Sequence, residues 1–188
     1  MDLPQPVIEL NDLTLRRFHG EADLPELHRV IDESLEHLRP WMAWVADHNP
    51  ASTAGFLSRR AERWAAGTEF SYAIVLDGAI VGLCDLFRRE ETPGGGWEIG
   101  YWLHPAVTGR GLATRAVRAL VEQAFALPGT AYVEIVHDPA NRASGAVPAR
   151  LGFTEHGRRP AERLAPAETG EDRIWRLTRP SATAPATP

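Results

Sequence analysis

The stretch Trp102-Leu-His-Pro-Ala-Val-Thr-Gly-Arg-Gly-Leu-Ala-Thr114 decides the fold of this chain, because a predicted strand ends in it and the most regular predicted helix begins in it. That helix spans about 111–127, and its apolar residues recur at the three- and four-residue spacing of one buried face. Gly109 and Gly111 lack a Cβ, so the backbone of the turn can approach a ligand closely. The first amides of a helix have no intrahelical partner and carry the positive end of its dipole. The stretch therefore predicts either a phosphate-binding turn or a simple tight turn.

Two common nucleotide-binding motifs do not fit this turn. A Walker A loop requires Gly-Lys-Ser/Thr, whereas Leu112 follows Gly111 here. A Rossmann fingerprint could begin at Gly109 and use Glu134 as its ribose acid, but Thr114 occupies the third small position. The preceding strand also ends an antiparallel meander and does not open a β-α-β unit. We therefore set both motifs aside.

Strand and helix signals alternate on both sides of the turn. The predicted strands span 13–18, 70–76, 79–87, 97–103, 131–136, 151–156 and 172–177. The predicted helices begin at Asp23, at Ser52 or Thr53, near Gly111 and at Asn141. Asp77-Gly78 joins two of the strands and is the strongest short hairpin signal. This order predicts an α+β domain with a mixed, mostly antiparallel sheet of about seven strands flanked by about four helices.

The length and composition describe one globular domain. The chain has 188 residues, of which 44% are apolar and 24% charged, as in ordinary folded domains. We expect an N-terminal extension at 1–10, a domain at 11–178 and a disordered tail at 179–188. The tail holds three prolines and no large apolar side chain, so burial cannot compensate for the entropy of ordering it.

Several classes of function are excluded by the composition. The net charge is −5 and no Lys/Arg-rich block occurs, so we expect no nucleic-acid partner. No signal peptide and no apolar run of about 18 residues is present, which predicts a cytoplasmic protein without a membrane span. Cys84 is the single cysteine, and the seven histidines include no H-x-x-x-H pair, so we expect no metal site.

Several spaced motifs together resemble one known family, the GNAT superfamily of N-acetyltransferases. The motifs are Glu98-Ile-Gly-Tyr-Trp-Leu-His-Pro105, Gly109-Arg-Gly-Leu-Ala-Thr114, Asn141-Arg-Ala-Ser144 and Leu151-Gly-Phe153. The aromatic turn His37-Leu-Arg-Pro-Trp-Met-Ala-Trp44 resembles the branch of the RimJ and RimL ribosomal-protein N-terminal acetyltransferases. The resemblance covers about residues 11–178. It implies the GNAT fold, with a sheet that splays apart between the predicted fourth and fifth strands, and acetyl-CoA as cosubstrate.

The resemblance assigns the acetyl-CoA contacts to two segments and one side chain. Backbone amides of the turn would hold the pyrophosphate, at Thr108, Gly109, Arg110, Gly111, Leu112 and Ala113. The end of the predicted fourth strand, at Trp102, Leu103 and His104, would bond the pantetheine arm and offer an amide to the thioester oxygen. Asn141 would orient that arm, and the alternative for it is an N-cap role. Thr108 departs from the family's Gln or Arg, which removes one side-chain contact.

The resemblance also offers candidates for catalysis and for acceptor binding. Glu98 and Glu91 match positions where relatives carry a base carboxylate, and the alternative for each is a solvated glutamate. Many relatives use a tyrosine to protonate the departing thiolate, but Pro148 stands at that position, and the RimL type instead uses a serine, here Ser144. Trp41 and Trp44 would line the entrance for the amine, with core packing as the alternative.

The resemblance implies an N-acetyltransferase that works by direct attack of an amine on acetyl-CoA. An α-amine is about a tenth neutral at pH 7, whereas a lysine amine is under about a thousandth neutral, so a weak base suffices for an N-terminus. We therefore expect the α-amine of a protein or peptide as the acceptor. The alternatives are a small amine or antibiotic acceptor, and a non-catalytic acyl-CoA binder, since the tyrosine acid is missing. The expected assembly is a monomer or a homodimer.

Overall fold

The structure, a computed structural model, describes residues 3–88 and 95–179. Its elements are β1 (Val7–Leu10), β2 (Leu13–Arg17), α1 (Leu24–Leu38), α2 (Pro50–Ala66), β3 (Glu69–Leu76), β4 (Ala79–Phe87), β5 (Gly96–Leu103), α3 (Leu112–Ala126), β6 (Tyr132–His137), α4 (Arg142–Arg150), β7 (Thr154–Pro160) and β8 (Glu171–Thr178). Short 3-10 turns lie at Gly20–Asp23, Ala43–Asp47 and Pro105–Val107. Within the described ranges, no helix is both long enough and apolar enough to span a membrane.

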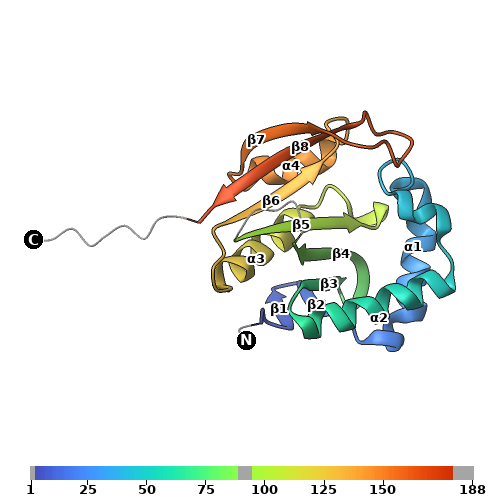
Figure 1. Ribbon diagram of the computed structural model, residues 1–188. Helices are drawn as coiled ribbons and strands as arrows, with labels where there is room; N and C mark the ends of the chain where they lie inside the picture. The colour runs from blue at the N-terminus through green and yellow to red at the C-terminus, as the bar shows by residue number, and fades with distance from the viewer. Residues whose placement is uncertain (1–2, 89–94, 180–188) are drawn as a thin grey trace, which may run out of the picture.

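The eight strands form one sheet, in the order β1-β2-β3-β4-β5-β6-β8-β7 (Figure 1). Every neighbouring pair is antiparallel except β5 with β6, which is parallel. The α+β class and the mixed, mostly antiparallel sheet are thus confirmed. One strand more than expected is present, because residues 7–10 of the predicted extension pair with β2. Of the predicted tail, only Arg179 lies within the described residues, and its Nε donates to the carbonyl of Thr130 at 2.8 Å.

Local sequence signals explain most of the element boundaries. Asp77 and Gly78 both adopt positive φ, 50° and 82°, which is the conformation that a tight hairpin between β3 and β4 needs. The start of α2 differs from the prediction, because the cap is Asn49 and not Ser52 or Thr53. Asn49 Oδ1 accepts from Ser52 N and Ser52 Oγ accepts from Asn49 N, both at 3.0 Å, which is a capping box. The fixed φ of Pro50 suits the first helical position and starts the helix earlier.

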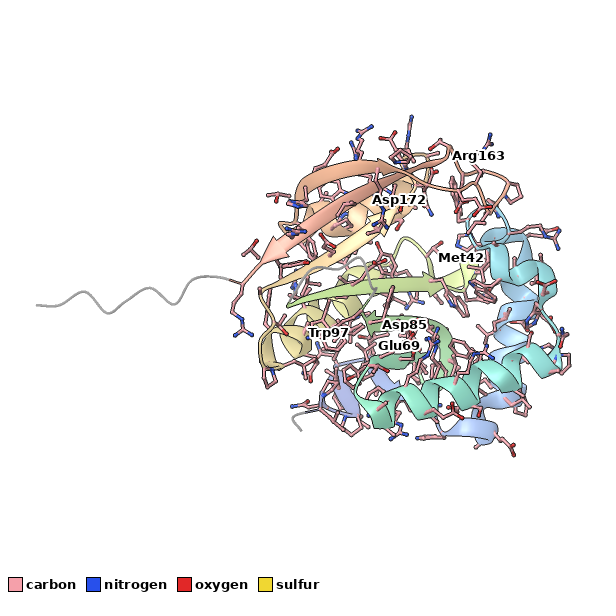
Figure 2. All side chains as sticks on the ribbon, viewed as in Figure 1. Met42, Glu69, Asp85, Trp97, Arg163 and Asp172 are labelled. Atoms are coloured by element: carbon pink, nitrogen blue, oxygen red, sulfur yellow. The ribbon has the colours of Figure 1, made fainter. Side chains whose placement is uncertain are left out.

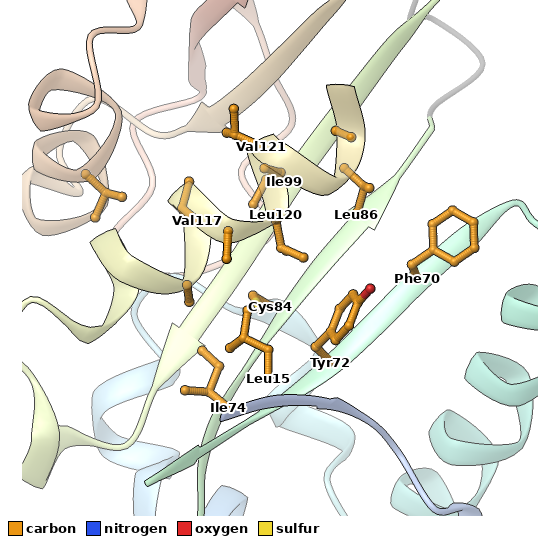
Figure 3. Close-up of a cluster of buried hydrophobic side chains, with 14 of the residues drawn as sticks. Leu15, Phe70, Tyr72, Ile74, Cys84, Leu86, Ile99, Val117, Leu120 and Val121 are labelled. Carbon is orange, nitrogen blue, oxygen red and sulfur yellow. The ribbon is translucent and has the colours of Figure 1, made fainter. Parts of the chain in front are cut away.

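The helices cover both faces of the sheet. Along β3, Tyr72 and Ile74 belong to the core beneath α3, whereas Ala73 between them belongs to the core beneath α1 and α2. Alternate residues of a strand point to opposite faces, so the two helix pairs lie on opposite sides. Figure 3 shows the larger core, in which Val117, Leu120 and Val121 of α3 face Cys84, Leu86 and Ile99 of the central strands. This rigid centre holds β4, β5 and the start of α3 in fixed positions.

Candidate active site

A wedge opens in the sheet between β5 and β6. The two strands pair only from Gly96 to Glu98, opposite Tyr132 to Glu134. Beyond that point β5 continues to Leu103 and β6 to His137, and Figure 1 shows them diverging toward their C-terminal ends. The expected splay between these strands is therefore confirmed. A wedge of this kind exposes main-chain groups of both strands to anything that enters it.

The hydrogen-bond pattern of β5 shows which amides face the wedge. His104 N donates to the carbonyl of Val81 at 2.8 Å, so His104 is tied to β4. Antiparallel partners alternate along a strand between groups that point to the partner and groups that point away. It follows that Trp102 directs its main-chain groups toward β4, whereas Tyr101 and Leu103 direct theirs toward β6. Of the predicted group at 102–104, the amide of Leu103 is the one that reaches the wedge.

The glycine turn leads from the tip of β5 into α3. Gly109 and Gly111 adopt φ of 74° and 75°, and no atom lies within 4 Å of where a Cβ would stand at either. Gly111 is the N-cap of α3 and offers no side chain to the first helical amides, at Leu112 and Ala113. Those amides and the helix dipole therefore favour an anion at the mouth of the wedge. Thr108 Oγ1 instead donates to the carbonyl of Pro105 at 2.9 Å, within the turn.

The arginines of this turn lie in different environments. Arg110 is exposed beside the two glycines. Arg115 donates through Nη2 to the Asp12 carboxylate at 2.6 Å and to the carbonyl of Leu10, so it fastens α3 to the β1–β2 turn. The hydrogen bond from Arg115 lowers the pKa of Asp12. Of the two, only Arg110 remains available to a phosphate.

A tyrosine and a serine bridge the wedge. Tyr101 Oη donates to the carbonyl of Ser144 at 2.8 Å and lies 3.3 Å from Ser144 Oγ. Asn141 Oδ1 accepts from Ser144 N at 3.1 Å, so Asn141 does cap α4. Burial raises the pKa of Tyr101 to about 12, which keeps its hydroxyl protonated at neutral pH. The two protonated hydroxyls therefore stand side by side at the edge of the wedge.

A cavity of about 420 Å³ lies on the α1–α2 face next to the wedge. It is lined by Ile31, Met42, Trp44, His48, Ser52, Thr53, Phe56, Arg59, Arg60, Leu83, Asp85, Phe87, Gly100, Tyr101 and Trp102. Trp44 is 44% exposed and stands 6.3 Å, ring centre to ring centre, from buried Trp102. Trp41 does not line the cavity among these residues. The aromatic turn thus contributes Met42 and Trp44 to a pocket that opens beside β5.

Of the two glutamates suggested as bases, the one within the described residues does not line this cavity. Glu98 is buried at the start of β5, opposite Phe87 and Glu134, and is absent from the described lining. Glu91 lies outside the described residues. The carboxylate that does line the cavity is Asp85 of β4. The sequence offered a signal for it, because Asp85 is the one charged residue in the apolar strand Ala79–Phe87.

Asp85 belongs to a buried group of charges between the sheet and α2. Arg60 Nη2 lies 3.7 Å from Asp85 Oδ2, and Arg60 also contacts the Glu69 carboxylate. Arg63 Nη1 lies 2.5 Å from Glu69 Oε2. Figure 2 shows Asp85 and Glu69 close together in this region. Burial raises the pKa of Asp85, against the opposing charge of Arg60, and burial lowers the pKa of Arg60.

Two histidines that are distant in sequence meet at the rim of the cavity. His48 Nε2 lies 2.9 Å and His28 Nε2 3.5 Å from the Asp32 carboxylate, and the two rings are 4.5 Å apart. Among the described residues, this is the group whose geometry could hold a metal ion. The search of the sequence for an H-x-x-x-H pair missed this group, because His28 and His48 come from different elements and are 20 positions apart.

Comparisons with known proteins agree with this geometry. A model of the acetyltransferase (GNAT) domain matches residues 12–154. The ribosomal N-acetyltransferase YdaF of Bacillus subtilis is 28% identical over 154 residues, 80% of this chain and 82% of YdaF. RimJ of Mycobacterium smegmatis, solved with CoA-disulfide, superposes with a TM-score of 0.78 at 25% identity, over 88% of this chain and 81% of RimJ.

RimL, a ribosomal L7/L12 alpha-N-protein acetyltransferase solved with coenzyme A, superposes with a TM-score of 0.83 at 20% identity. The superposition covers 92% of this chain and 97% of RimL, and it shows the same fold. Because the family model spans most of the chain, this protein belongs to the GNAT acetyltransferase family and is an acetyl-CoA-dependent N-acetyltransferase.

Proposed function

We propose that the acceptor of the acetyl group is the α-amine at the N-terminus of a protein, and that this protein is a ribosomal protein. The relative YdaF is named as a ribosomal N-acetyltransferase, and RimL as an acetyltransferase of a ribosomal protein's α-amine. The arithmetic of amine ionisation also supports an α-amine, since about a tenth of it is neutral at pH 7. A ribosomal acceptor would place the reaction in the cytoplasm.

The observation that carries this proposal is the wedge between β5 and β6, which opens beside the cavity on the α1–α2 face. The pyrophosphate of acetyl-CoA binds the first amides of α3, beyond Gly111, and its pantetheine arm runs into the wedge. The amide of Leu103 or Tyr101 then donates to the thioester oxygen. Such a donor contributes about 3 kcal/mol when the carbonyl oxygen becomes negative during attack.

The proton for the departing thiolate comes from the bridge across the wedge. Ser144 Oγ and Tyr101 Oη are within hydrogen-bond distance, and both stand where α4 faces β5. Tyr101 thus takes the part that a tyrosine at the position of Pro148 plays in other relatives. Asn141 supports this arrangement by capping α4 and fixing the main chain of Ser144.

The test is acetylation of peptides that carry the first residues of ribosomal proteins. Each peptide is offered with acetyl-CoA in three forms: with a free α-amine and no lysine, with a blocked α-amine and one lysine, and with both amines blocked. We expect CoA release only with the first form, and tandem mass spectrometry should place the acetyl group on the α-amine. Acetylation of lysine alone would contradict the proposal, as would binding of acetyl-CoA without turnover.

A small amine is the second candidate acceptor. The cavity of about 420 Å³ falls within the size range of small-molecule sites, roughly 300–1,000 Å³. Phenethylamine and an aminoglycoside belong in the same assay as the peptides. A kcat/KM for either that exceeds the kcat/KM of every free α-amine peptide would favour this second function.

A further inference from the structure

The cavity of about 420 Å³ on the α1–α2 face has one acidic side chain among its described lining residues, that of Asp85. The residue is 8% exposed, and its strand β4 forms part of the cavity floor. Gly100 lies directly across from it on β5. Cross-strand partners share a face of the sheet, so Gly100 places no side chain beside the carboxylate, and a Cβ there would meet the Phe87 ring at 3.4 Å.

Asp85 and Arg60 both keep side-chain atoms without a hydrogen-bond partner within this group of charges. Asp85 Oδ1 has no hydrogen-bond partner among the described residues, and Oδ2 faces Arg60 at the long distance of 3.7 Å. Arg60 and Arg63 both engage Glu69, which lies two residues before Ser71, the cross-strand partner of Asp85 on β3. A buried carboxylate with incomplete pairing is costly. A cation that enters the cavity and binds Asp85 Oδ1 would give this oxygen the partner that it lacks.

Two arginines also line the cavity: Arg59 is exposed, and Arg60 is paired with Glu69. The rest of the lining is mainly apolar. Its apolar side chains are those of Ile31, Met42, Trp44, Phe56, Leu83, Phe87 and Trp102. Trp44 forms the exposed rim and Trp102 the buried wall beside β5. The chemistry of the cavity thus matches a ligand with a positive charge at one end and an apolar body at the other.

We propose that Asp85 binds the ammonium group of the acceptor and accepts its proton, and that the acceptor carries a large apolar group beside the amine. This inference rests on the proposed transfer to an amine at this site. The matching chemistry occurs in a peptide whose first residue is apolar, such as methionine, and in an arylalkylamine such as phenethylamine. The experiment below separates these two sources.

The step balances in atoms and charge. One N–H proton moves from the ammonium ion to Asp85 Oδ1, and the freed nitrogen pair forms a bond to the thioester carbon. The C–S bond breaks, and its electron pair leaves on the sulfur of CoA. The nitrogen loses a second proton as the amide forms, and the thiolate gains one from the bridge of Ser144 and Tyr101. The second amine proton passes to the bridge through water and restores it. Asp85 returns its proton to water, so the products are the acetyl amide, CoA thiol and one proton.

The experiment measures kcat/KM with acetyl-CoA and three probes: Met-Gly-Gly-amide, Ser-Gly-Gly-amide and phenethylamine. We expect the methionine peptide to exceed the serine peptide at least about ten-fold in the wild-type protein. Asp85→Asn should lower kcat/KM for the methionine peptide by about 100-fold at pH 7, in line with removal of a general base. The loss should shrink near pH 9, where the free amine is already neutral. Asp77→Asn, in the exposed β3–β4 turn, is the matched control.

A folding defect is separated from a chemical one by two further measurements. Titration with acetyl-CoA should give the same Kd for Asp85→Asn as for the wild type, because the carboxylate lies on the acceptor side. Trp44→Ala alters only the exposed rim, and it should reduce the preference for the methionine peptide about ten-fold.

The two proposals fail in different ways. Full activity of Asp85→Asn, or equal use of the methionine and serine peptides, would overturn the inference while leaving transfer to a protein N-terminus intact. Turnover of phenethylamine but of no peptide, with the loss in Asp85→Asn, would support the inference and remove the protein acceptor.

Discussion

Gly82 is a position where one added methyl group should move β5, the strand proposed to donate an amide to the thioester oxygen. A Cβ built on Gly82 of β4 would lie 2.3 Å from the carbonyl oxygen of Trp102 and 3.0 Å from Leu103 Cα, both on β5. These are main-chain atoms, so no flexible side chain can rotate away. Gly82 also lies beside a break in the β3–β4 register, where Val81 is the extra residue of β4. Gly82→Ala therefore acts on the strand that carries the amide of Leu103.

The size of the effect follows from these distances. Ordinary contacts at such a site begin at 3.4 Å, so β5 has to move away by about 1 Å. Overpacking of this kind costs about 1–3 kcal/mol. For a chain of this length, each kcal/mol corresponds to about 2–4 °C, so we expect a fall in Tm of about 2–12 °C. A displacement of about 1 Å at a reacting centre can lower the rate about 100-fold.

The assay compares Tm by calorimetry, the Kd of acetyl-CoA by titration, and kcat/KM for the best acceptor. We expect Gly82→Ala to lose more in kcat/KM than in acetyl-CoA affinity, because the pyrophosphate turn is untouched. Gly157→Ala is the control, since a Cβ at Gly157 in β7 meets nothing within 4 Å. Equal melting of Gly82→Ala and the wild type, with kcat/KM unchanged, would refute the argument that β5 and its amide are displaced.

Three further predictions concern the anion site, the pH dependence of stability and a helix cap. Gly111→Asp should weaken acetyl-CoA binding at least about ten-fold relative to Gly111→Asn, because both side chains strain the same positive φ but only aspartate repels the pyrophosphate; equal Kd values by titration would argue against the site. Burial lowers the pKa of His137 below the usual value of about 6.5, so the unfolded chain binds the proton more strongly. The contribution of neutral His137 to the free energy of unfolding is fully present above about pH 6.5 and decreases as the pH falls below that value. His137→Gln should therefore show a smaller decrease in Tm between about pH 7 and pH 5 than the wild type. Curves of Tm against pH that run parallel for the two proteins would contradict this prediction. Asn49→Ala removes the capping box of α2 and should lower Tm by about 2–4 °C, whereas exposed Ser58→Ala in the same helix should not, and calorimetry decides between them.

The site that the sequence predicted best is the one built from consecutive residues. The turn from Thr108 to Ala113 joins a strand to a helix, and the structure gives both of its glycines positive φ and leaves the first amides of α3 open. Turns, caps and helix periodicity depend on residues within a few positions of each other. A pattern in the sequence therefore suffices to predict them, as it did for the Asp77-Gly78 hairpin.

Other expectations failed where two local signals competed. Ser52 is a good N-cap residue, but Asn49 followed by Pro50 is a better start, and Ser52 becomes the second half of its capping box.

The extension at residues 7–10 carried too short an apolar pattern to predict a strand. It forms β1 because β2 offers it a free edge and Arg115 of α3 holds the turn between them.

The sequence by itself determined the family, the order of the elements from β2 to β8 and the conformation of the glycine turn, because these depend on spaced motifs and local conformation. Only the tertiary structure decided which side chains meet at the candidate site. Tyr101 reaches Ser144 across 43 positions, and Asp85 meets Arg60 from another element. The pairing of β4 with β5, and the divergence of β5 from β6, set these distances. Burial then raises the pKa of Tyr101 and of Asp85, and the surroundings of a side chain exist only once the sheet and its helices have packed.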